Sequence, residues 1–287
     1  LGATFPLFFN HEAPINFSKS IISICFGTMA AGLIYALSIR VGLSSAYPTM
    51  IALLALTIFN SWRFKDHISF NIFSLTHFDF VLYLSIFLVF GGLFIATAYQ
   101  MGKGSFPIMF FNTDTPYRLS QAFSLISASE YPPESLMTEG MRYAYHYGGP
   151  TTVALISRVT QIAVHKVMFW IMIPLLALGL YCIILEITRH LTPNRYYQLF
   201  CTLLFVPNFL LGEHALTLFA PNSILDGQEL LRLVTTNLIE TIPDIAPISS
   251  FFLLALSVLL VISNPSSRIV VLALFSVFLT IFFKTNL

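Results

Sequence analysis

Apolar runs dominate this sequence and limit the folds that it can adopt. A helix needs about 20 residues to cross the roughly 30 Å hydrocarbon core of a bilayer, and shorter runs can extend into neighbouring polar residues. Only 9% of the residues are charged and the mean hydropathy is +0.81, so we expect lipid to be the main solvent. The sequence predicts an all-α, polytopic transmembrane bundle of about seven spans. The runs are residues 20–39, 47–59, 80–99, 167–187, 199–211, 251–262 and 269–283.

The basic residues between the spans predict the orientation of the bundle. By the positive-inside rule, we place the short loops that carry them in the cytoplasm. The long loops 100–166 and 212–250, which hold most of the acidic residues, then lie outside. We therefore expect one integral membrane domain over residues 1–287, multi-pass in a bacterial inner membrane, with the lipid bilayer as a partner. The basic residues are Arg63, Lys65, Arg189, Arg195 and Arg268.

Four further features refine this expectation. A net charge of +1 gives no basic face for nucleic acid. Residues 150–166 have an apolar face and a polar face at helical spacing, which predicts a helix lying in the membrane interface. The chain begins with Leu, so we expect a processed or incomplete chain. The cysteines lie in or beside apolar runs and are expected to be small packing residues, namely Cys25, Cys182 and Cys201.

Residues 110–149 form a polar segment within this apolar chain. Thr115 suits a helix N-cap, Pro116 suits the first turn, and the apolar residues that follow predict an amphipathic helix over 112–128. Asp114 then lies where a span meets this helix. Its carboxylate either stabilises the helix dipole or takes part in chemistry, and the sequence leaves both open. The apolar positions are Leu119, Ala122, Phe123 and Ile126.

Two aromatic and proline-rich motifs follow that helix. Tyr131-Pro132-Pro133-Glu134 predicts a stiff turn back towards the membrane. The segment 143–149, YAYHYGG, suits an interfacial aromatic belt, with a surface for sugar stacking as the alternative. His146 within it is either a proton carrier or an interfacial hydrogen-bonding side chain.

The order of these features resembles the first large extracytoplasmic loop of GT-C membrane glycosyltransferases, in the mannosyltransferase and aminoarabinose-transferase branch. The resemblance covers about residues 110–166. It implies a polyprenyl-phosphate-linked sugar as donor and Asp114 as the catalytic base or as a ligand of a divalent metal. The chain departs from the family in having one such Asp, three spans before the loop and about seven spans in total. The positions implied for substrate binding are Arg118, Glu134, Glu139, Arg142, Tyr145, His146 and Arg158.

Other functional classes fit the sequence less well. Histidines at mid-span, as in a haem protein, are not seen. Glu186 and Pro174 are the only features in the spans that suggest a transporter, and the adjacent Glu213 and His214 lack further metal ligands. The main alternative is a non-catalytic subunit that packs against other membrane subunits in a larger complex. For each arginine singled out above, contact with a lipid headgroup is also open.

Overall fold

The computed structural model describes residues 17–43, 46–63, 80–81, 84, 114–128, 130, 132–136, 148–201, 245–263 and 267–283. Helices make up most of these ranges, and no strand is formed within them. The all-α prediction is therefore confirmed for this part of the chain. The helices are α1 (Phe17–Arg40), α2 (Tyr47–Arg63), α4 (Asp114–Ser127), α5 (Gly148–Thr160), α6 (Val164–Lys166), the π-helical turn η3 (Val167–Met172), α7 (Ile173–Leu191), α11 (Ile245–Ser263) and α12 (Ser267–Phe283).

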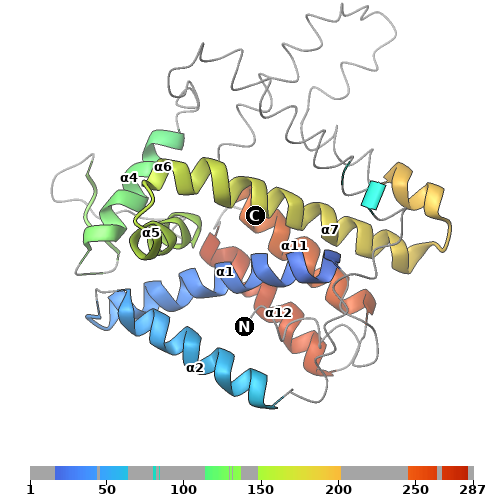
Figure 1. Ribbon diagram of the computed structural model, residues 1–287, viewed down its shortest axis with the longest axis horizontal. Helices are drawn as coiled ribbons and strands as arrows, with labels where there is room; N and C mark the ends of the chain where they lie inside the picture. Colours follow the sequence, from blue (N-terminus) through green and yellow to red (C-terminus); the bar gives the residue numbers. More distant parts are fainter. Residues whose placement is uncertain are drawn as a thin grey trace, which may run out of the picture.

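Contacts at the helix ends define how the bundle runs (Figure 1). His190 near the end of α7 bonds to Ser263 at the end of α11, so these two helices run in the same direction. Arg189 in α7 donates to Ser18 at the start of α1, so α1 runs antiparallel to α7. The helix α12 packs along α11, while α4 and α5 pack together at the far end, against the second half of α1.

The core lies where α1, α7 and α11 meet, and a glycine permits their close approach. A Cβ at Gly179 would lie 2.5 Å from Sγ of Cys25 in α1 and 2.8 Å from Cε2 of Phe252 in α11. The Cys25 thiol donates to the carbonyl of Leu175 at 3.2 Å. Small residues at such a point allow extensive contact between apolar helices. Cys25 and Cys182 are buried free cysteines, as predicted, whereas the free Cys201 is exposed.

Two helices are long and apolar enough to cross a membrane, judged by length and composition. They are Phe17–Arg40, with 24 residues, and Val164–Leu191, with 28 residues. Three shorter apolar helices, Tyr47–Phe59, Ser249–Ser263 and Val270–Thr280, coincide with further predicted spans. The helices at these five apolar runs are confirmed, but a bundle of seven spans is not. Most of the predicted spans 80–99 and 199–211 lies outside the described residues.

The predicted interfacial helix over 150–166 differs from the observed structure. The helix α5 ends at Thr160, Gln161 has a φ of 61°, and the chain becomes helical again at Val164. The first eight residues of α5 are buried because α1 and α4 both pack on it. The prediction of one continuous surface helix was therefore wrong, because contacts from distant segments determine which face is covered.

Candidate functional site

The structure describes four of the eight positions implied by the resemblance. Asp114 is the first residue of α4, and Arg118 follows it by four residues. Arg158 lies in α5, next to α4. Glu134 is exposed in the short described stretch 132–136. The remaining four lie outside the described residues: Glu139, Arg142, Tyr145 and His146.

The amphipathic helix predicted after Asp114 is present, but its buried face differs from the prediction. Leu119 and Ala122 are buried as expected, whereas Phe123 is half-exposed. The buried face instead takes in Arg118, only 3% exposed, and Gln121, which is fully buried. The helix also begins one residue before the predicted N-cap, a difference within the usual range for helix ends. Among the described elements, α4 packs mainly on α5.

Arg118 and Gln121 form a polar pair within this buried face. The guanidinium Nη1 of Arg118 donates to Oε1 of Gln121 at 3.3 Å, and its Cζ lies 5.6 Å from the centre of the Tyr117 ring. A buried guanidinium needs such partners, because moving its charge out of water costs roughly several kcal/mol when no hydrogen bond or opposite charge compensates for the lost hydration. The pair places a permanent positive charge one turn from the start of α4.

Arg158 joins three helices through hydrogen bonds. Its Nη1 donates to the hydroxyl of Tyr35 in α1 at 3.1 Å and to the carbonyl of Ile126 in α4 at 2.9 Å. The Tyr35 hydroxyl in turn donates to the carbonyl of Leu125 at 3.2 Å. The last carbonyls of a helix have no partner within it and carry partial negative charge. Arg158 and Tyr35 therefore hold the end of α4 against α1 and α5.

Buried polar residues from α5 and α11 lie at the same end of the bundle. Thr152 donates to the carbonyl of Gly148 at 2.9 Å, and a Cβ at Gly32 of α1 would fall on its Oγ1. Ser249 and Ser250, near the start of α11, are fully buried, and α11 packs on α5. Together with Arg118 and Gln121, these side chains give this end of the bundle a polar interior.

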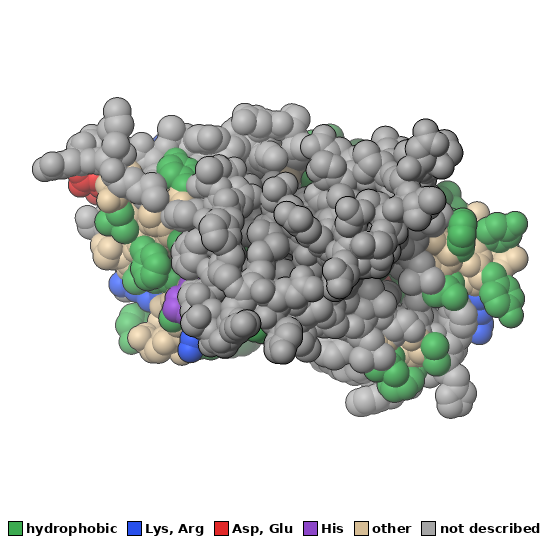
Figure 2. Space-filling view, turned by 90° about the horizontal axis from the view of Figure 1, so that it is seen from above, with side chains coloured by type: hydrophobic (Ala, Val, Ile, Leu, Met, Phe, Trp, Pro, Cys, Tyr) green, Lys and Arg blue, Asp and Glu red, His purple; other side chains and the backbone are tan. Residues whose placement is uncertain are grey.

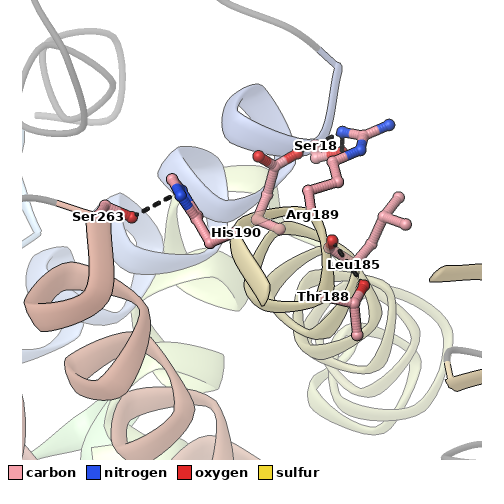
Figure 3. Close-up of polar contacts among 7 residues, drawn as sticks. Ser18, Leu185, Thr188, Arg189, His190 and Ser263 are labelled. Carbon is pink, nitrogen blue, oxygen red and sulfur yellow. Dashed lines mark hydrogen bonds and ion pairs between the residues drawn. The ribbon is translucent and has the colours of Figure 1, made fainter. Parts of the chain in front are cut away.

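A second polar cluster lies at the opposite end of α7, and sequence reasoning did not identify it (Figure 3). Arg189 forms an ion pair with Glu186 at 2.5 Å and donates to Oγ of Ser18 at 3.4 Å. His190 lies 3.1 Å from Oγ of Ser263. The spacing of Glu186 and Arg189 was a local signal for the pair, but only the fold brings Ser18 and Ser263 beside it. Within the described residues, no group of three or more His, Cys, Asp or Glu side chains is placed to hold a metal ion.

Comparison with protein-family models, curated proteins and solved structures finds no match for this chain.

Proposed function

We propose that this chain is a multi-pass membrane protein. The exposed faces of its outer helices support the proposal. In α11 the exposed large apolar residues Phe251, Leu254, Val258 and Val261 follow helical spacing and form one stripe. The exposed sides of α2 and α12 carry similar rows, including Ile51 and Leu54 in α2 and Val271, Leu274 and Phe278 in α12. Contiguous apolar surfaces of this kind are rare on soluble monomers and fit contact with acyl chains.

We propose further that the protein transfers a sugar from a polyprenyl-phosphate donor to an acceptor hydroxyl on the extracytoplasmic side. The observation that carries this proposal is the polar interior at the α4 and α5 end of the apolar bundle. A lipid-linked sugar has an apolar tail and a polar, anionic head, so it suits a polar site at one end of apolar helices. Asp114 and Arg118 lie one turn apart at the start of α4, where such a head would be bound.

The reaction needs a base and a cation at this place. In the proposed step, the carboxylate of Asp114 takes the proton of the acceptor hydroxyl, whose oxygen bonds to the anomeric carbon of the sugar. The bond from that carbon to the phosphate oxygen breaks, and the polyprenyl phosphate leaves with the bonding electrons. Arg118 stabilises the phosphate charge, because a guanidinium matches phosphate oxygens. Arg158 instead positions α4, through its bonds to Tyr35 and Ile126.

Asp114→Asn tests this proposal. The amide keeps the size of the side chain but cannot accept the proton, so turnover should fall by about 10²- to 10⁴-fold, as is usual when a general base is lost. The assay follows sugar transfer in reconstituted vesicles with a panel of polyprenyl-phosphate sugars. Glu130→Gln is the matched control, since it makes the same chemical change at an exposed acid just beyond α4.

Three results would contradict the proposal. Full turnover by a folded Asp114→Asn variant would remove Asp114 from the chemistry. An equal loss in Glu130→Gln would show that the effect is not specific to the site. No transfer by the unmodified protein from any donor in the panel would favour the alternative, a non-catalytic subunit. Co-purification of other membrane proteins with the chain would then test that alternative directly.

A further inference from the structure

The exposed tyrosine and tryptophan rings lie at the two ends of the described bundle. Among the described residues, the well-exposed ones are Tyr47, Trp170, Tyr196 and Tyr197, with exposed fractions of 55% to 80%. The exposed stripe of α11, which lies between these ends, consists of Phe, Leu and Val side chains instead. Exposed rings that carry a hydrogen-bonding group are thus separated along the bundle from side chains that carry none.

Trp170 and Tyr47 belong to the end formed by α4 and α5. Trp170 lies in η3, which packs on α5, and the exposed Lys166 precedes it by about one helical turn. Tyr47 is the first residue of α2, and its neighbour Ala46 packs against the cluster that contains Leu125 of α4. Two segments that are far apart in the sequence therefore bring a ring to the same end.

Tyr196 and Tyr197 belong to the end where α7 and α11 finish. The Oδ1 of Asn194 accepts from the backbone N–H of Tyr196 at 2.9 Å, and Gln198 donates to the carbonyl of Thr192 at 2.9 Å. These bonds hold the two rings beside the end of α7. Figure 2 shows both ends of the molecule, with hydrophobic side chains beside basic ones at each.

The distance between the two ends matches the hydrocarbon core of a bilayer. At about 1.5 Å per residue, the helix from Trp170 to Leu191, the last residue of α7, spans about 30 Å. A typical hydrocarbon core is also about 30 Å thick. Tyrosine and tryptophan are enriched at both membrane–water interfaces, because each ring is largely apolar and ends in a polar N–H or O–H group. The spacing therefore fits one ring layer at each interface.

We propose that two aromatic belts set the depth of this protein in the bilayer. Trp170 and Tyr47 lie at the headgroup level on the side of α4 and α5, and Tyr196 and Tyr197 lie at the headgroup level on the other side. The proposal rests on the membrane location proposed above but not on sugar transfer.

This depth puts the polar interior of the α4 and α5 end at the edge of the hydrocarbon. Arg189 donates to Ser18, so the start of α1 is level with the end of α7. From Ser18 to Tyr35, α1 rises by about 26 Å, which brings Tyr35 close to the depth of Trp170. The Tyr35 hydroxyl bonds to the Leu125 carbonyl near the end of α4. The helix α4 therefore lies where the polar head of a lipid is found.

Depth-dependent fluorescence quenching tests the belts. The chain has two tryptophans, so Trp62→Phe leaves Trp170 as the only one. The protein is reconstituted into phosphatidylcholine vesicles whose acyl chains carry bromine either near the carboxyl end or near the methyl end. Bromine quenches a tryptophan that it contacts, so the more effective of the two lipids reports the depth of the ring.

Three forms with a single tryptophan are compared. The first keeps Trp170, the second carries Trp170→Phe with Tyr196→Trp, and the third carries Trp170→Phe with Phe251→Trp. Bromine near the carboxyl end should quench the first two more strongly. Phe251 is the matched control, because it is 46% exposed but lies about 18 Å along α11 from Ser263, which bonds to His190 at the end of α7. Bromine near the methyl end should quench this form more strongly.

The outcomes separate the belts from the membrane location. If Phe251→Trp is quenched but a belt position is not, or is quenched at least as strongly by the deeper bromine, the belts are overturned and the membrane location stands. If none of the forms is quenched, both are overturned. Tyr197→Trp takes the place of Tyr196→Trp if circular dichroism shows that the latter does not fold. Because quenching does not depend on turnover, a failure of the transferase proposal leaves this test unchanged.

Discussion

Tyr35→Phe tests the hydrogen bonds that hold α4 against the bundle. The substitution keeps the ring, which is fully buried, and removes only the hydroxyl. That hydroxyl donates to the Leu125 carbonyl at 3.2 Å and accepts from Arg158 at 3.1 Å. Arg158 keeps its bond to the Ile126 carbonyl, so two hydrogen bonds are lost and not three.

The expected loss of stability follows from these two bonds. Interhelical hydrogen bonds in membrane proteins contribute about 0.6 kcal/mol on average and up to about 1.7 kcal/mol. Two of them give about 1 to 3 kcal/mol for Tyr35→Phe. The free energy of unfolding is measured by titrating the purified protein from a mild detergent into SDS, with helical circular dichroism as the signal. Tyr196→Phe is the control, because that side chain is 80% exposed and should change stability by less than about 0.5 kcal/mol.

A double-mutant cycle distinguishes the hydrogen bond from general packing. Arg158→Met keeps much of the side-chain bulk and removes the guanidinium. If Arg158 and Tyr35 interact as observed, the double variant should lose less stability than the sum of the two single variants, by about 0.5 kcal/mol or more. Strict additivity, or a loss in Tyr35→Phe no larger than in Tyr196→Phe, would refute the role given to this pair.

Two further substitutions test the packing of the bundle. Gly179→Ala should cost about 1 to 3 kcal/mol in the same unfolding assay, because the new methyl group would collide with Cys25 and Phe252; unchanged stability would contradict the close approach of α1, α7 and α11. Ser124→Ala should be neutral or stabilise by up to about 1 kcal/mol, because the buried Oγ of Ser124 finds no hydrogen-bond partner among the described residues. A loss above about 1 kcal/mol in Ser124→Ala would reveal a partner for that hydroxyl.

The positions of the helices could be predicted from the sequence, because helix formation in an apolar segment is a local property. Five of the predicted runs coincide with helices, and α1 extends the predicted run 20–39 by only a few residues, to Phe17–Arg40. The start of α4 near Asp114 also followed from local signals, namely a cap residue and a proline in the first turn. In each case, residues within one or two turns of each other carry the information.

The candidate site could be predicted only in part from the sequence. Sequence reasoning placed Asp114 and Arg118 at the start of one helix, but it expected Arg158 to line a substrate pocket. The observed partners of Arg158 lie 123 residues away, at Tyr35, and 32 residues away, at Ile126. No local pattern encodes such contacts, so the hydrogen bonds by which Arg158 holds α4 could be found only in the fold.

The sequence by itself determined that the chain forms apolar helices and which segments form five of them, because hydropathy and capping act over neighbouring residues. Only the tertiary structure decided which face of each helix is covered. It buried Arg118 and exposed Phe123 in α4, the helix that packs mainly on α5. It also brought Lys19 and Ser18 to Glu186 and Arg189, because α1 and α7 run antiparallel. The two polar ends of the bundle therefore exist only once the helices have packed.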